Sequence, residues 1–230
     1  MRLLQYHCLP ITPMRVLEKY MSGRRLMLSW AHRQNENIIR QVAGGYAVDN
    51  GAYTYWRKGR EPDWAGFYDW LRWLPDRDWF VIPDVIDGSE EENDALLAEC
   101  AIWDGVPVWH MHESFERLEH LLSRYSRVAQ GSSGLYSEVG SESWHRRMHD
   151  AMGVICDEDG KPRRYIHMLR CLNPEVYRRY PFTSADSSHF ARNHHRDGPH
   201  EILAWLARHD AAERYDVAVW YQPTLREAAR

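Results

Sequence analysis

Short apolar runs recur along the chain and alternate with longer amphipathic stretches. The runs are rich in β-branched and aromatic residues, and few polar residues interrupt them, which is typical of parallel strands buried on both faces. We therefore predict eight strands. They span residues 3–8, 26–31, 45–51, 79–85, 106–111, 127–133, 165–171 and 182–188.

Helical patterns lie between most of these runs. The stretch 61–74 places its aromatic residues at helical spacing, so they form one apolar face. Ser89 precedes an acidic first turn, which predicts the start of a helix over 89–105. The other predicted helices span 12–23, 113–125, 141–156, 173–180 and 200–210.

Eight strands that alternate with helices predict an α/β fold, a single (β/α)₈ TIM-type barrel over residues 1–230. At 230 residues such a barrel would be compact. The alternative is an open doubly wound sheet. No glycine-rich G-x-G-x-x-G turn follows the first predicted strand, so the pattern favours the barrel.

Composition changes this picture in two ways. No apolar run approaches the roughly 18 residues of a membrane helix, so we expect a cytoplasmic protein without a membrane partner. The net charge of −4 is unevenly spread, with 13 acidic and two basic residues between 61 and 104. Elsewhere arginine pairs recur, which predicts either a local basic face or separate solvated helix faces. The pairs begin at Arg24, Arg146, Arg163 and Arg178.

The four cysteines, Cys8, Cys100, Cys156 and Cys171, form no C-x-x-C pair. Their spacing therefore indicates neither a cysteine-rich zinc site nor a disulfide framework. We expect no metal and no redox cofactor from them.

Polar side chains gather where the predicted strands end. In a barrel, the carboxyl ends of the strands and the loops after them build the active site. Three carboxylates on three strand ends would then converge on one pocket. The polar residues at these ends are Asp49, Asn50, Asp84, Asp87, His110, His112, the 131–134 segment Gly-Ser-Ser-Gly, His167, Arg170 and Asp186.

Some of these residues have structural interpretations. Asp87 precedes the acidic helix, and we predict that it caps that helix. The Asp49-Asn50-Gly51 sequence is also a turn signal. His110 and His112 alternate along a strand, which fits either metal ligation or ordinary packing.

Convergent carboxylates suit displacement at a sugar carbon. One acid can attack an oxocarbenium-like anomeric centre as a nucleophile, and another can handle the proton of the leaving group. A third can hydrogen-bond the N–H edge of a base, while an aromatic side chain stacks on that base.

Three segments resemble those of tRNA-guanine transglycosylases. Residues 48–56, "VDNGAYTYW", resemble the "DSGGFQ"-type segment, and 81–88, "VIPDVIDG", resemble the substrate-binding acid segment. Residues 167–192 are similar to the late segment that carries the nucleophile. The resemblance covers patches between 45 and 192 and is greatest to the shorter phage-type, DpdA-like DNA-guanine transglycosylases, which insert 7-deazaguanine derivatives into DNA.

The resemblance implies a role for each matching residue. Asp186 would be the nucleophile that forms a covalent glycosyl-enzyme, and Asp49 would be the acid/base or positioning residue. Tyr53 would stack on the base, and Asp84 would bind the edge of guanine or deazaguanine. Two further residues, Gly131 and Ser132, would make close contacts with the base.

The chain also departs from that family. It lacks the C-x-C-x-x-C…H zinc site and the region that helps the tRNA enzymes to grip tRNA. Strand 165–171 reads "YIHMLRC", so Arg170 stands where a small residue is expected, and we count His167 and Arg170 among the substrate-binding candidates. The guanidinium of Arg170 would contact a phosphate or a base substituent, or it would form a structural salt bridge.

These features lead to one principal hypothesis. The protein is expected to be a base-exchange transglycosylase that acts on guanine in DNA, with a free 7-deazaguanine such as preQ0 as co-substrate and without a cofactor. The closest alternative is the same base-exchange reaction with tRNA as the substrate.

Two other classes stay open. One is a metal-dependent barrel hydrolase that uses His110, His112, His167 and Asp186 around a divalent ion. The other is a barrel that binds a base or a DNA segment without chemistry.

Overall fold

The computed structural model describes residues 3–213 of the chain. Nine parallel strands form one sheet in the order β5-β4-β3-β2-β1-β9-β8-β7-β6. The strands are β1 (Leu4–Cys8), β2 (Arg25–Ser29), β3 (Gly45–Asp49), β4 (Trp79–Val81), β5 (Gly105–Val106), β6 (Val108–His110), β7 (Arg127–Gly131), β8 (Tyr165–Met168) and β9 (Ser184–Ser187).

The sheet is nearly closed as a barrel, and its two edge strands are parts of one predicted strand. β5 pairs with β4, β6 pairs with β7, and only Pro107 separates β5 from β6. Proline has no N–H to donate, so the ladder is interrupted there, although the carbonyl of Pro107 still accepts a hydrogen bond from the N–H of Ala129. The prediction of an α/β barrel of the (β/α)₈ type is confirmed, and the open doubly wound alternative is wrong.

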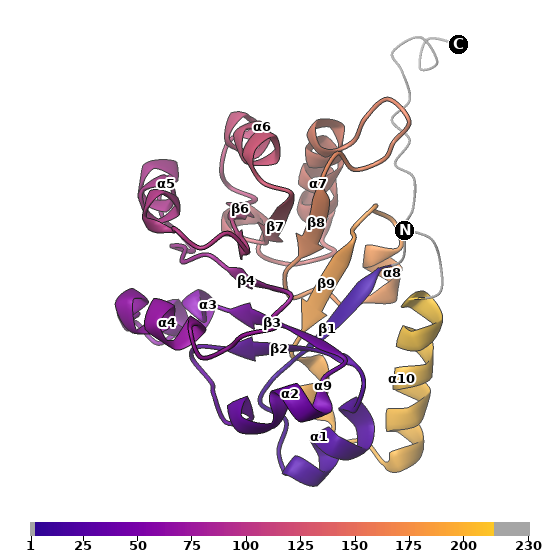
Figure 1. The fold of residues 1–230 in the computed structure, drawn as a ribbon. Coiled ribbons are helices and arrows are strands. Elements are labelled where there is room, and N and C mark those ends of the chain that lie inside the picture. The colour runs from indigo at the N-terminus through magenta and orange to yellow at the C-terminus, as the bar shows by residue number, and fades with distance from the viewer. Residues whose placement is uncertain (1–2, 214–230) are drawn as a thin grey trace, which may run out of the picture.

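Helices surround the strands, which lie in the middle of the molecule (Figure 1). The predicted helices all form, each a few residues shorter or longer than expected. The α-helices are α1 (Met14–Met21), α2 (Ile39–Val42), α3 (Ala52–Arg57), α4 (Trp64–Leu71), α5 (Glu90–Glu99), α6 (Phe115–Arg124), α7 (Glu142–Ile155), α8 (Pro174–Tyr177), α9 (His189–Asn193) and α10 (Pro199–Glu213).

Two apolar layers join the helices to the outside of the sheet. One contains buried residues of α6, α7 and α8 together with residues of β6 to β9. The other contains residues of α1, α2, α4, α9 and α10 together with residues of β2 to β4. α10 is also tied to β1 by the side chain of Gln5, whose amide exchanges hydrogen bonds with His209.

A third apolar cluster fills the middle of the barrel. Its buried members come from seven strands, β1 to β7, and include Tyr6, Met27, Trp79 and Ala129. Side chains two positions farther along these strands point to the same side. The barrel is therefore plugged by apolar side chains, and polar residues that follow the plug line its carboxyl end.

The helix α3 was not predicted from the sequence. Its N-cap is Gly51, which adopts a left-handed conformation with φ 79° and lies against Ala31, where a Cβ would come within 2.8 Å of the Ala31 side chain. The short helices α2 and α9 were also missed. None of the helices within residues 3–213 is long and apolar enough to cross a membrane.

Candidate active site at the carboxyl ends of the strands

A cavity of about 710 Å³ opens at the carboxyl ends of the strands. We call it the acid cavity, because Asp49, Asp84 and Asp186 all line it. Its volume lies in the range of small-molecule sites. Seven of the eight residues predicted for the site line it, namely Asp49, Tyr53, Asp84, Gly131, Ser132, Arg170 and Asp186. The eighth, His167, is fully buried and bonds to Asp186.

Three donors hold the carboxylate of Asp186, which lies one residue before the end of β9 and is buried. The Oδ1 atom accepts hydrogen bonds from the backbone N–H of Arg170 at 2.9 Å and from Nε2 of His167 at 3.1 Å. Within residues 3–213, the Oδ2 atom accepts one, from the thiol of Cys8 at 3.1 Å. The carboxylate is therefore fixed in orientation, and Oδ2, which accepts fewer hydrogen bonds than Oδ1, is the oxygen that is freer to react.

The hydrogen bonds of His167 define its tautomer. A carboxylate can only accept, so Nε2 carries the proton that is donated to Asp186. The other ring nitrogen, Nδ1, then accepts from the hydroxyl of Ser184 at 2.8 Å. Burial lowers the pKa of His167, against the raising effect of Asp186. The neutral ring is thus a positioning group for Asp186.

The thiol of Cys8 is a second neutral donor to Asp186. Burial, with a further contribution from the Asp186 charge, raises the pKa of Cys8 well above its usual range. The thiol therefore keeps its proton and its hydrogen bond at neutral pH.

Asp49 is in a different environment from Asp186. Its Oδ2 accepts one hydrogen bond, from the hydroxyl of Ser29 at 2.8 Å. Burial is the largest cause that raises the pKa of Asp49, and with the nearby carboxylates of Asp186 and Asp84 it brings this pKa from 3.8 to about 6, against the lowering effect of the hydrogen bonds from Ser29 and the backbone of Gly51. Asp49 can therefore exchange a proton close to neutral pH.

Asp84 is held from both sides. The amide of Asn50 donates to Oδ1 at 2.6 Å, and Nε2 of His110 lies 2.8 Å from Oδ2. Asn50 also donates to the carbonyl of Ile82 and accepts from the N–H of Ala52, so it links the end of β4 to the start of α3. Asp84 is 7% exposed, and each oxygen keeps a lone pair for a ligand N–H.

Gly131 makes room for a histidine. A Cβ at this position would come within 2.9 Å of Nδ1 of His110. The neighbouring Ser132 uses its hydroxyl to accept from the indole N–H of Trp144 at 2.9 Å. Both residues line the acid cavity as expected. However, His110 fills the space beside Gly131, and the hydroxyl of Ser132 is bonded to Trp144.

Arg170 crosses the cavity. Its backbone has φ 59°, a left-handed conformation that is uncommon for residues other than glycine. One guanidinium nitrogen donates to the carbonyl of Ser132 at 2.8 Å, and the guanidinium carbon lies 4.1 Å from the centre of the Tyr53 ring. The alternative of a structural salt bridge is not found, because no carboxylate of residues 3–213 pairs with Arg170 in the described contacts.

The residues of the metal-hydrolase alternative are divided among separate contacts. His110 bonds to Asp84, and His167 bonds to Asp186. His112 is exposed and bonds to the hydroxyl of Ser133 and the carbonyl of Gly88. In the described part of the chain, no three His, Cys, Asp or Glu side chains are placed to hold a metal ion.

The predicted capping role of Asp87 is wrong. Ser89 is the N-cap of α5 and forms a capping box with Glu92. Asp87 accepts instead from the indole N–H of Trp56 at 2.8 Å. The sequence Asp-Gly-Ser offers two cap residues, and the one next to the helix has the required extended backbone.

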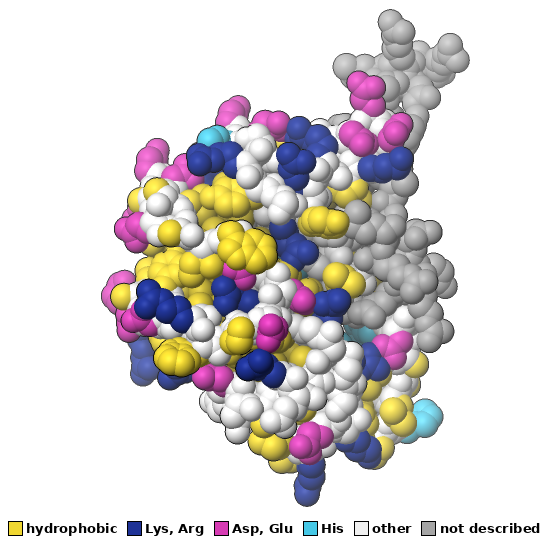
Figure 2. Space-filling model, viewed as in Figure 1, with side chains coloured by type: hydrophobic (Ala, Val, Ile, Leu, Met, Phe, Trp, Pro, Cys, Tyr) yellow, Lys and Arg dark blue, Asp and Glu magenta, His cyan; other side chains and the backbone are white. Residues whose placement is uncertain are grey.

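Several members of the arginine pairs are neutralised by acids. Arg24 pairs with Asp210, Arg25 with Asp78, and Arg163 with Glu119. On the face seen in Figure 2, basic and acidic side chains are interspersed, and hydrophobic side chains gather in the region of α4 and α5. These arginines therefore act at least partly as structural partners of acids.

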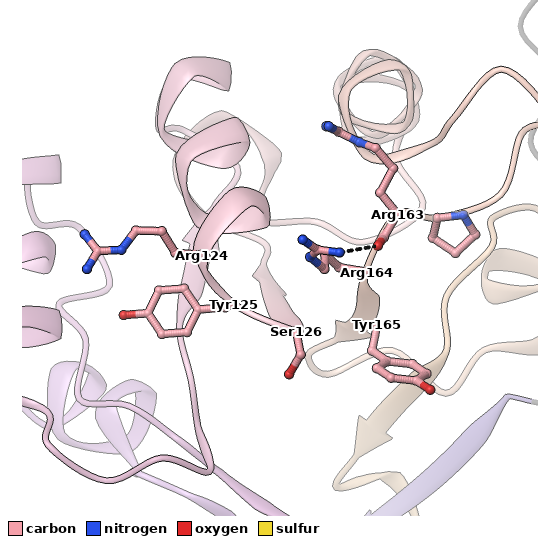
Figure 3. Close-up of a pocket in the computed structure, with 7 residues that line it drawn as sticks. Arg124, Tyr125, Ser126, Arg163, Arg164 and Tyr165 are labelled. Carbon is pink, nitrogen blue, oxygen red and sulfur yellow. Dashed lines mark hydrogen bonds between the residues drawn. The ribbon is translucent and has the colours of Figure 1, made fainter.

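A second hollow lies at the opposite end of the barrel. Figure 3 shows this arginine cleft, of about 520 Å³, between the residues that precede β7 and those that precede β8. Its arginines are Arg124, Arg163 and Arg164, and all three are exposed. Arg164 donates to the backbone carbonyls of Leu122 and Arg163. No carboxylate lines this cleft.

Two residues of the acid cavity were missed by the sequence analysis. Cys8 ends β1 and Ser29 ends β2, and each bonds to one of the acids. Strand alternation carries the signal that would have identified them, because both stand two residues after a plug residue, Tyr6 and Met27. The rim also contains the cations Arg57, Lys58 and Arg192.

Comparisons of the chain with protein-family models, with curated proteins and with solved structures find no match.

Proposed function

We propose that the protein is a base-exchange transglycosylase that replaces guanine in DNA by a 7-deazaguanine base through a covalent intermediate on Asp186. The observation that carries this proposal is the convergence of three carboxylates on one cavity, two in β3 and β9 and one just after β4, each in a different environment. The segment resemblance to guanine transglycosylases supports the same chemistry. A guanine that leaves the stack of the duplex is small enough for a cavity of about 710 Å³.

In the first step, Asp186 acts as the nucleophile. Its Oδ2 accepts one weak hydrogen bond, from a thiol, whereas Oδ1 accepts two. Oδ2 attacks C1′ of the target nucleotide, the C1′–N9 bond breaks, and the bonding electrons leave with guanine. The proton that neutralises the departing base comes from Asp49, which is suited to this by its pKa of about 6.

In the second step, the roles reverse. The carboxylate of Asp49 takes the N9 proton of the incoming 7-deazaguanine, N9 attacks C1′, and the bond to Asp186 breaks. Two displacements leave the configuration at C1′ unchanged, and Asp186 returns as a carboxylate. Asp84 is placed to accept hydrogen bonds from the N–H edge of either base, because each of its oxygens keeps a free lone pair.

A base-exchange assay tests this proposal. The protein is incubated with duplex DNA that contains radiolabelled guanine, together with excess preQ0, and the release of label is followed. Wild type should release label from DNA, and Asp186→Asn should reduce the release to background. The same assay with labelled tRNA distinguishes the nucleic-acid substrates, since release from tRNA alone would overturn the DNA assignment and keep the mechanism.

Asp87→Asn provides the matched control. Asp87 is an exposed acid close to the site that does not line the cavity, and an asparagine oxygen can still accept from Trp56. This variant should exchange guanine at the wild-type rate. If wild type releases no label from either nucleic acid, the proposed function is wrong.

A further inference from the structure

Arg170 joins opposite walls of the acid cavity. Its backbone follows β8, whereas its guanidinium lies over the ring of Tyr53 in α3, and four strand-to-strand steps separate β8 from β3 in the sheet. In a nearly closed barrel of this size, that distance is about half of the circumference. The side chain therefore reaches across the mouth of the cavity.

The ring of Tyr53 has three described neighbours. The farthest is the guanidinium of Arg57, whose carbon lies 6.0 Å from the ring centre. The indole of Trp56 lies 5.6 Å away at an angle of 32°, and this side chain does not line the cavity. The guanidinium of Arg170 lies 4.1 Å from the ring centre and does line it. Arg170 thus occupies the cavity-facing side of Tyr53, which is the side that a planar ligand inside the cavity would need.

The two halves of Arg170 are held with different strength. The backbone N–H bonds to the buried carboxylate of Asp186, and the left-handed conformation fixes this direction. The exposed side chain makes one hydrogen bond, to the carbonyl of Ser132, and the contact with Tyr53. Both side-chain contacts are weak at an exposed site, so the side chain can move while the backbone stays in place.

We propose that the side chain of Arg170 is a latch that a planar base displaces from Tyr53 when it occupies the acid cavity. This inference rests on the proposed function, because it takes the ligand to be a guanine-type base. The latch covers the three carboxylates while the cavity is free of base. Its release moves only the side chain and leaves the N–H of Arg170 on Asp186.

Arg170→Gly tests the latch without disturbing Asp186. Glycine adopts a positive φ readily and keeps the backbone N–H, so the variant should fold and should keep its bond to Asp186. The probe is guanine, and its binding is measured by calorimetry. Because the base no longer competes with the guanidinium, the variant should bind guanine about tenfold more tightly than wild type.

Arg60→Ala is the control. Arg60 is an exposed arginine shortly after α3 that does not line the cavity. This variant loses the same charge but not the latch, so its affinity for guanine should equal that of wild type. Equal tightening in both variants would overturn the latch and indicate a general charge effect.

Nuclear magnetic resonance gives a second, direct readout. The Nε–H signal of Arg170, identified by its absence in Arg170→Gly, should carry a ring-current shift from Tyr53 and lose it when guanine is added. Guanine that binds Arg170→Gly equally or more weakly, or leaves the Nε–H signal unchanged in wild type, overturns the latch while the proposed function stands. If guanine and preQ0 bind neither protein, the proposed function itself is overturned, and the latch with it.

Discussion

Acidic side chains have different kinds of partners at the two ends of the barrel. At the amino ends of the strands, Asp78 pairs with Arg25 and Asp104 pairs with Arg77. At the carboxyl ends, the hydroxyl of Ser29 holds Asp49, and the thiol of Cys8 is one of the neutral donors to Asp186. An arginine cancels the charge of its partner, whereas a neutral donor orients a carboxylate and leaves its charge in place.

The arginines at the two ends of the barrel also differ in their partners. Those of the cleft at the amino end are exposed, and among them Arg163 bonds to Glu119 and Arg164 bonds to main-chain carbonyls. Arg170, at the carboxyl end, lies beside three acids and bonds to none of them through its guanidinium. We therefore expect the acids at the amino ends to contribute to stability and those at the carboxyl ends to carry out the proposed chemistry.

The largest effect is expected from Asp186→Asn. The amide is a poor nucleophile, so base exchange should fall by at least about 10³-fold, while the free energy of unfolding changes little. Rates are measured by release of labelled guanine, and folding by circular dichroism. A variant that keeps more than a tenth of the wild-type rate would remove Asp186 from the chemistry.

A smaller loss is expected from His167→Phe. The ring fills much of the same space, but Asp186 loses one of its three donors. The value of kcat should fall about 10- to 100-fold with little change in KM, because orientation of the nucleophile matters most in the transition state. His167→Gln retains a donor and should recover part of the rate. Equal losses in both variants would indicate a purely structural role.

Asp104→Asn should have the opposite profile. Asp104 accepts from Arg77 at 2.9 Å, and Arg77 also donates to the carbonyls of Leu71 and Leu74. Breaking this partly buried ion pair should lower the free energy of unfolding by about 2–3 kcal/mol, measured by urea titration. The rate of base exchange should not change. A catalytic defect in folded Asp104→Asn would contradict the expectation that acids at the amino ends contribute to stability alone.

The smallest effect is a pH dependence caused by Asp49. The pKa of Asp49 is raised from 3.8 to about 6 in the folded protein, so the folded state holds this proton more tightly than the unfolded state. The protonated carboxyl of Asp49 therefore makes its full contribution to the free energy of unfolding below about pH 4, and this contribution is lost as the pH rises through 6. Asp49→Asn should therefore exceed wild type in stability by about 1–2 kcal/mol at pH 8.

Urea unfolding of both proteins at several pH values measures this difference. The gap between Asp49→Asn and wild type should shrink as the pH falls and vanish near pH 4. A gap that is constant with pH would mean that the carboxyl of Asp49 titrates normally.

The sequence contained enough information for the barrel and for the acids. Buried parallel strands are continuous apolar runs, so all eight were visible, and Asp49, Asp84 and Asp186 follow from where such runs stop. The helix α3 was not visible, because its six residues include Tyr, Thr and Trp, which favour strands. Its position depends on tertiary contacts such as the bond from Asn50 to Asp84.

The finer features of the site depend on register and backbone conformation. The sequence shows a polar residue near each strand end, but it does not show that Cys8 and Ser29 face the same side as the acids until the register is known. The left-handed backbone of Arg170 and its reach to Tyr53 arise from the loop after β8. No local pattern encodes such a contact between opposite walls.

Intact-protein mass spectrometry can detect the covalent intermediate on Asp186. Wild type is mixed with a guanine-containing DNA duplex in the absence of added base and is denatured in acid. We expect a protein–DNA adduct that digestion maps to Asp186, that disappears when preQ0 is added, and that is absent from Asp186→Asn. An adduct on another residue, or base exchange without any adduct, would contradict the assignment of Asp186 as the nucleophile.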